Sequence, residues 1–184
     1  VLGNLEKKYV LNLQQTFLFS TLAWLSVAIF GSIPFILSTS EMSLSDAFFE
    51  SMSGITTTGA TTIANLEITP KSILLWRAIL QWLGGIGIVV MAITILPLLK
   101  VGGMQVFRME APDTTEKILP RTIEVATSII LIYLLLTSLC ALFYWLFGMS
   151  LFDSLAHSMT TIATGGFSTH NDSIGFFKSA NIEI

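Results

Sequence analysis

Two short segments rich in threonine and glycine could bind a cation through their main-chain carbonyl groups. These Thr/Gly segments consist of Thr57, Thr58 and Gly59 in the first case and of Thr164, Gly165 and Gly166 in the second. Glycine leaves its carbonyl group unobstructed, and rings of main-chain carbonyl oxygens can replace the hydration shell of an ion. The chemistry open to these residues is therefore reversible coordination of a cation. The simpler interpretation is that they form tight turns between helices.

The Thr/Gly segments lie inside an internal repeat. Residues 42–62, MSLSDAFFESMSGITTTGATT, align without gaps with residues 149–169, MSLFDSLAHSMTTIATGGFST. Ten aligned positions are identical, among them the pairs Thr57/Thr164 and Gly59/Gly166. An internal repeat predicts two copies of one supersecondary unit.

Each copy of the repeat carries the start signal of a helix. Ser43 and Asp46 have the spacing of a capping box, in which serine accepts a hydrogen bond from a first-turn amide, and Ser150 and Asp153 repeat it. About ten residues later the Thr/Gly segments allow backbone angles that end a helix. Ten helical residues span roughly 15 Å, which is about half a bilayer. The repeat therefore predicts a half-helix followed by an extended segment, as in a re-entrant pore loop.

Three charge-free stretches could hold these half-helices in a membrane: residues 17–37, 78–96 and 125–147. Each is close to the roughly 20 apolar residues that cross a bilayer. The chain is 53% hydrophobic and 11% charged, with a mean hydropathy of +0.77. Such a composition disfavours a soluble protein, in which three apolar core helices would need a large polar shell. The fold class that we predict is an all-α membrane protein of helix–pore loop–helix repeats, similar to potassium channels.

The basic residues predict the orientation. By the positive-inside rule, the N-terminus and the loop at 100–121 face the cytoplasm, and the repeated segments open to the outside. The basic residues behind this assignment are Lys7, Lys8, Lys100, Arg108, Lys117 and Arg121. The predicted organisation is a cytoplasmic lead (1–16), a first helix–pore–helix repeat (17–99), a cytoplasmic linker (100–121) and a second repeat (122–184) that is truncated before its final helix.

A half-helix that enters from outside directs its negative C-terminal end toward the membrane centre, where it favours a cation. Irregular backbone at that depth persists only where it is buried in protein or lines water. Both arguments predict that main-chain carbonyls of the Thr/Gly segments face an ion path.

Several single residues have ordinary explanations as well. Arg77 could extend to the lipid headgroups, or it could contact the pore helix. His157 occupies the repeat position of Glu50, and polar packing is favoured over a metal site because too few ligands lie near it. The glycines of GGIG (84–87) indicate close helix packing.

Four longer stretches resemble the TrkH/TrkG subunits of bacterial Trk potassium-uptake systems, which form one superfamily with KtrB and the plant HKT transporters. They are FFESMSGITTTGATTI, RAILQWLGGIGIVVMAITILPLL, GGMQVFRMEAP and HSMTTIATGGFSTHNDSIGFF. In that family four helix–pore–helix repeats surround one ion path, and each supplies one filter strand with a key glycine. The resemblance implies that Gly59 and Gly166 are filter glycines, with Thr57, Thr58, Thr164 and Gly165 beside them.

The resemblance also implies a fragment of a longer polypeptide, whose remaining repeats complete the pore in the lipid bilayer of the bacterial inner membrane. It implies a homodimer and a TrkA-like cytoplasmic nucleotide-binding regulatory subunit as partners. The expected function is inward K⁺ movement, without an enzymatic activity, an organic cofactor or a nucleic-acid partner. The alternatives are a non-transporting membrane scaffold related to these transporters and a channel-like carrier for another small solute. The preference for K⁺ over Na⁺ stays open.

Overall fold

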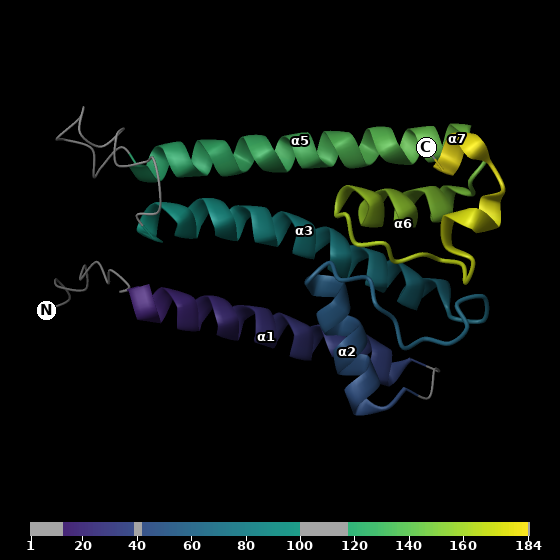
Figure 1. Cartoon of the computed structure of the whole chain (residues 1–184), viewed down its shortest axis with the longest axis horizontal. Coiled ribbons are helices and arrows are strands. Elements are labelled where there is room, and N and C mark those ends of the chain that lie inside the picture. The colour runs from purple at the N-terminus through teal and green to yellow at the C-terminus, as the bar shows by residue number, and fades with distance from the viewer. Residues whose placement is uncertain (1–12, 39–41, 100–117, 184) are drawn as a thin grey trace, which may run out of the picture.

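The computed structural model describes residues 13–38, 42–99 and 118–183, and the regular secondary structure in this part of the chain is helical. Three long helices, α1 (Leu13–Leu37), α3 (Lys71–Leu99) and α5 (Ile118–Leu146), run side by side in alternating directions (Figure 1). Two short helices, α2 (Leu44–Ile55) and α6 (Leu151–Ile162), follow α1 and α5. A 3₁₀ helix, η1 (Ser173–Phe177), and a single turn, α7 (Ala180–Glu183), come last. The predicted all-α class is confirmed.

Among the described residues, three segments are long and apolar enough to cross a membrane: Gln14–Leu37, Lys71–Met91 and Glu124–Leu146. The predicted spans at 17–37 and 125–147 match the first and third closely. The charge-free stretch at 78–96 lies inside α3, and the span expected around it, about 72–99, matches Lys71–Leu99 closely. Most of the predicted lead (1–16) and linker (100–121) lies outside the described residues, but residues 13–16 and 118–121 are helical.

The outer faces of the long helices are apolar and uncovered. Phe19 on α1 is 68% exposed and Leu131 on α5 is 61% exposed. Only 6% of the most apolar window of α5 is buried within the chain. Water would disfavour so much apolar surface, so these faces require lipid or further protein around them.

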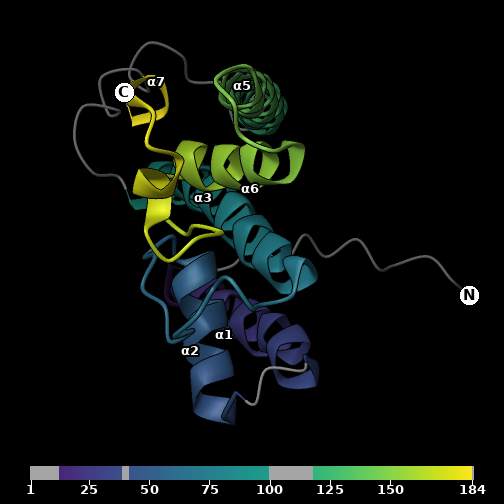
Figure 2. The same cartoon turned by 90° about the vertical axis from the view of Figure 1, so that its right-hand side faces the viewer.

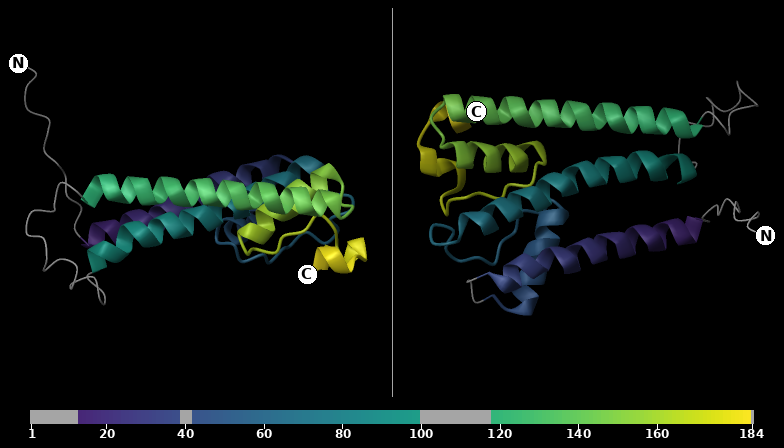
Figure 3. Two further views of the ribbon diagram at one scale, coloured as in Figure 1. Left: turned by 90° about the horizontal axis from the view of Figure 1, so that it is seen from above. Right: turned by 180° about the vertical axis from the view of Figure 1, so that it is seen from behind.

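The two short helices lie at the same end of the long helices, away from the N-terminus (Figures 1 and 3). Helix α2 packs against α1 and α3, whereas α6 packs against α3 and α5. Figure 2 looks onto this end and shows α3 between the two short helices. Helix α3 is therefore the element through which the two copies of the repeat meet.

The predicted caps are present at the start of both short helices. The amide of Asp46 donates a 3.1 Å hydrogen bond to Ser43 Oγ, and the amide of Asp153 donates one of 3.1 Å to Ser150 Oγ. Each serine hydroxyl in turn donates to the aspartate carboxylate, which lies at the positive end of the helix. The local sequence thus determines where both short helices begin.

An apolar core holds α2 against the two long helices beside it. Phe35 of α1, Ala47 of α2, and Ile73 and Leu80 of α3 are buried together. At the other end of α2, a Cβ placed on Gly84 would collide with the carbonyl oxygen of Ile55. The packing interpretation of the GGIG glycines is confirmed at this position, where the α3 backbone touches the last residue of α2.

We expect Gly84→Ala to destabilise the protein and Gly87→Ala to leave it nearly unchanged. The methyl group at residue 84 must displace a backbone oxygen, and overpacking of this kind costs about 1–3 kcal/mol. At Gly87 the nearest atom to a new Cβ is 3.6 Å away, on the Trp24 ring. The melting temperature of the purified complete protein in detergent measures the difference. Equal melting temperatures for the two variants would show that α3 does not approach α2 this closely.

Candidate cation-binding site

Both short helices end in the same hydrogen-bonded turn. The amide of Thr58 donates to the carbonyl of Ser53, and the amide of Gly165 donates to the carbonyl of Thr160, each over 2.9 Å. Thr57 and Thr164, one residue earlier, have φ angles of 56° and 55°. These are the bonds and the left-handed residue of a Schellman motif. Each Thr/Gly segment therefore leaves its helix in the same direction relative to the helix axis.

The prediction that glycine would end these helices is wrong. Threonine occupies the left-handed position at the helix end in both copies, and two positions later Gly59 and Gly166 also have positive φ angles, of 79° and 82°. A β-branched residue in this conformation is strained, typically by about 1–3 kcal/mol, and such strain is concentrated at functional sites. The six-to-one hydrogen bond of the motif holds the threonine there.

The structure brings the two Thr/Gly segments together. A Cβ placed on Gly59 would collide with the carbonyl oxygen of Gly165, so the two backbones touch at this point. A Cβ on Gly166 would meet nothing within 4 Å among the described residues. Gly165 is buried, whereas Thr164 and Gly166 on either side of it are exposed. The contact between the segments thus leaves part of each one accessible.

Within the described residues, the carbonyl oxygens of the Thr/Gly segments take no part in backbone hydrogen bonding, although that of Gly165 is packed against Gly59. In the described part of the chain, none of the six accepts a hydrogen bond from a backbone amide. The next carbonyl along, that of Ala60, accepts a hydrogen bond from a side chain, the Ser53 hydroxyl, at 2.6 Å. Both segments also follow the C-terminal, negative ends of α2 and α6, which favour a cation. The arrangement can therefore coordinate a cation without any charged side chain.

A buried ion pair lies behind the segments. Arg77 of α3 is 1% exposed, and its Nε lies 2.6 Å from Oε1 of Glu50 on α2. The expected contact of Arg77 with the short helix of the first repeat copy is confirmed, and the headgroup interpretation is wrong, because the carboxylate compensates the buried charge. Glu50 also accepts hydrogen bonds from Thr61 Oγ1 and from the Thr62 amide, both of 2.9 Å.

Helix α3 also binds the chain that follows the second segment. Arg77 Nη1 donates a 3.2 Å hydrogen bond to the Ser168 carbonyl, and its guanidinium lies 4.1 Å from the centre of the Phe167 ring. One turn later, Oε1 of the fully buried Gln81 accepts a 3.1 Å hydrogen bond from the Phe167 amide. Sequence analysis missed Gln81, although a polar residue four positions after Arg77 in an apolar helix indicates a shared polar face.

His157 is packed among polar groups, as predicted, and contacts the chain just after the second Thr/Gly segment. Its Nδ1 lies 2.9 Å from the Asp153 carbonyl, to which it must donate, so its Nε2 accepts from Ser168 Oγ at 3.0 Å. Burial lowers the pKa of His157, and the charge of His170 lowers it further, against the opposing effect of Asp153. Among the described residues, no group of three or more His, Cys, Asp or Glu side chains could hold a metal ion.

The loops beyond the segments are joined as well. The amide of Leu66 donates a 2.8 Å hydrogen bond to Oδ1 of Asn171, whose amide group donates to Asn65 Oδ1 over 3.2 Å. Nearby, His170 Nδ1 lies 3.1 Å from a carboxylate oxygen of Glu67. The two copies of the repeat are thus connected both behind and beyond the Thr/Gly segments.

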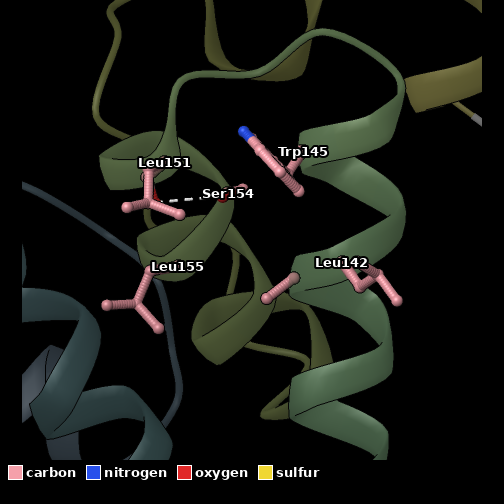
Figure 4. Close-up of a pocket in the computed structure, with 6 residues that line it drawn as sticks. Leu142, Trp145, Leu151, Ser154 and Leu155 are labelled. Carbon is pink, nitrogen blue, oxygen red and sulfur yellow. Dashed lines mark hydrogen bonds between the residues drawn. The ribbon is translucent and has the colours of Figure 1, made fainter.

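A hollow between α5 and α6 is lined mainly by apolar side chains, unlike the Thr/Gly segments. Leu142, Trp145, Leu151 and Leu155 line it together with Ser154, whose hydroxyl donates to the Leu151 carbonyl over 3.0 Å (Figure 4). Besides the Ser154 hydroxyl, the polar group among these side chains is the Trp145 indole N–H, which can only donate, and the hollow contains no residue of the Thr/Gly segments. It therefore lacks the ligands for a cation.

Comparisons with known proteins give one consistent result. Residues 2–184 match the family described as TrkH, cation transport protein. The chain is 50% identical over 182 residues to the Trk system potassium uptake protein TrkH of Escherichia coli strain K12. It is 37% identical over 172 residues to TrkG of the same strain. These alignments cover 97% and 91% of the chain but only 38% and 35% of the relatives, so the chain spans little more than a third of their length.

A solved structure has the same fold. The crystal structure of the potassium transporter TrkH from Vibrio parahaemolyticus superimposes with a TM-score of 0.82 at 45% sequence identity, over 95% of this chain and 35% of that one. The family is one of cation transport proteins and not of enzymes, in agreement with the sequence prediction. The chain belongs to the TrkH family of cation transport proteins.

Proposed function

We propose that this chain is part of the pore-forming subunit of a bacterial potassium-uptake transporter and supplies two of the four strands of its selectivity filter. The observation that carries the proposal is the contact between two Thr/Gly segments that leave matching helix ends with unbonded carbonyls. The names of its relatives, potassium uptake proteins of Trk systems, support K⁺ as the ion. The remaining strands would come from the rest of the transporter.

The proposed mechanism uses main-chain oxygens alone. A potassium ion that enters from outside loses part of its hydration shell, and carbonyls of residues 57–59 and 164–166 replace the lost water molecules. The negative ends of α2 and α6 offset part of the cost of dehydration. Electrical and concentration gradients then move the ion inward.

The location and partners follow from the family resemblance. We infer that the three spans lie in the bacterial inner membrane with the N-terminus and residues 100–121 on the cytoplasmic side. The other repeats of the same polypeptide would complete the pore. A homodimeric assembly and a TrkA-like nucleotide-binding subunit are the proposed protein partners.

Growth at low potassium tests this function. Bacteria that lack their own potassium-uptake systems receive the complete transporter, either unchanged or as Gly166→Ser or Gly175→Ala. Gly166→Ser must place a side chain at a φ of 82° beside the ion path, so we expect weaker K⁺ uptake or admission of Na⁺. Gly175 lies on η1 with open space around it and serves as the control. An unchanged transporter that reaches the membrane but carries no K⁺ would favour the scaffold alternative.

A further inference from the structure

We propose that Arg77, Gln81 and Glu50 form a brace that fixes the two filter strands relative to each other and thereby contributes to ion selectivity. The proposal rests on the proposed function, because it assigns these residues to the same filter. It adds side chains that touch no ion and act only by positioning the strands. The three residues are among the most deeply buried side chains of the described chain.

The first half of the brace holds the strand after α2. Glu50 projects from α2 and accepts hydrogen bonds from the side chain of Thr61 and the amide of Thr62, just beyond Gly59. Its Oε1 also binds Arg77 Nε at 2.6 Å. A displacement of Arg77 would therefore move the carboxylate that fixes the end of the first strand.

The second half of the brace holds the strand after α6. Arg77 donates to the carbonyl of Ser168, and Gln81 accepts from the amide of Phe167, so α3 binds two consecutive residues directly after Gly166. The Phe167 ring lies against the guanidinium as well. Because Arg77 and Gln81 are one turn apart on one helix, they fix both the position and the direction of the second strand.

Gln81 also lies where the two strands touch. A Cβ on Gly165 would collide with its side-chain amide, and a Cβ on Gly59 would lie 3.6 Å from its Nε2. The amide thus fills the space directly behind the contact between the strands. A single rigid helix therefore sets the spacing of two filter strands that come from different repeats.

The second copy has no carboxylate at the position equivalent to Glu50. His157 replaces Glu50 and binds Ser168 through a neutral hydrogen bond, so its contact stays within its own repeat. In contrast, the Arg77–Glu50 pair contacts both strands, because Arg77 also binds the Ser168 carbonyl. This asymmetry predicts that changes at Arg77 affect both strands, whereas changes at His157 affect the second strand alone.

The test compares Arg77→Lys and Gln81→Met with Trp76→Phe in the complete transporter. Lysine keeps the charge for Glu50, but its single ammonium group does not reproduce the fork that also binds Ser168. Methionine leaves the Phe167 amide unpaired at similar side-chain volume. Trp76→Phe removes the 2.9 Å hydrogen bond to the Gly31 carbonyl, which joins α3 to α1 away from the filter. The K⁺ flux and the Na⁺ flux are each measured in vesicles, and their ratio is compared between variants. The amount of folded transporter is measured separately.

We expect both brace variants to lower this ratio by about tenfold, the effect of losing one hydrogen bond to a buried or charged group, and Trp76→Phe to preserve it. A merely structural role would reduce the amount of folded protein and leave the ratio unchanged, and that result overturns the proposal. If Arg77→Lys does not reach the membrane, the ratio for Gln81→Met decides. If the unchanged transporter carries no K⁺, the proposed function itself is contradicted. If the unchanged transporter prefers K⁺ and the brace variants prefer it equally, only the brace is contradicted.

Discussion

Gly59→Ser is expected to abolish selective potassium uptake by the complete transporter. Two independent effects act at this residue. Its φ of 79° strains any side chain, and its Cβ would collide with the Gly165 carbonyl oxygen of the neighbouring strand. The collision must move a proposed ligand of the ion. Because a displacement of about 1 Å in a positioned group can cost on the order of a hundredfold in rate, we expect a loss of that size in K⁺ flux.

The matched control for this variant is Gly148→Ser. Gly148 has a φ of 107° in the turn between α5 and α6, but a Cβ there meets nothing within 4 Å. It therefore carries the backbone strain without the contact between strands. Tracer uptake of K⁺ and Na⁺, normalised to the amount of membrane protein, separates the two effects. Equal losses in both variants would mean that strain alone explains the result and that the contact at Gly59 has no role in conduction.

Glu50→Ala is expected to cause the largest loss of stability among substitutions behind the Thr/Gly segments. It leaves the Arg77 cation buried without its carboxylate, and breaking a buried pair in this way typically costs about 3–5 kcal/mol. It also removes the acceptor for the amide of Thr62. The melting temperature of the purified complete transporter in detergent measures the loss.

Two further variants identify the cause. Glu67→Ala also removes a carboxylate that faces a basic side chain, that of His170, but Glu67 is 45% exposed, so we expect a change of at most about 1 kcal/mol. Glu50→Leu combined with Arg77→Met removes both buried charges and should recover part of the stability lost in Glu50→Ala. If Glu50→Ala melts no lower than Glu67→Ala, the pair does not stabilise the fold, and the account of the buried ion pair is wrong.

The features that sequence predicted correctly depend on nearby residues. The serine and aspartate that start α2 and α6 are three positions apart, so the capping interaction is visible without knowledge of the fold. The apolar spans follow from composition over about 20 residues. The meeting of the two Thr/Gly segments could be expected because the repeat places them at equivalent positions.

The features that sequence left open or missed depend on partners far along the chain. Arg77 binds Glu50, which is 27 positions away, and Ser168, which is 91 positions away. Gln81 meets Phe167 across 86 positions. Periodicity cannot distinguish such a buried polar face from residues that reach the headgroups.

The left-handed threonines were missed because propensity assigns that conformation to glycine. In this chain the hydrogen bond from residue 58 to residue 53, and its counterpart from 165 to 160, overrides that preference. The glycines are thereby available two positions later, where the strands come into contact. Tertiary packing therefore determines which residue of each Thr/Gly segment carries the strain.

The most direct test of the central claim is a crystal structure of the complete transporter grown in rubidium, with anomalous diffraction recorded to locate the ions. We predict Rb⁺ peaks on an axis lined by the carbonyls of Thr57 to Gly59 and Thr164 to Gly166, with Arg77 and Gln81 behind the strands and not in contact with the ions. Peaks confined to other parts of the protein, with these carbonyls turned away from them, would contradict the assignment of the Thr/Gly segments as the ion-binding site.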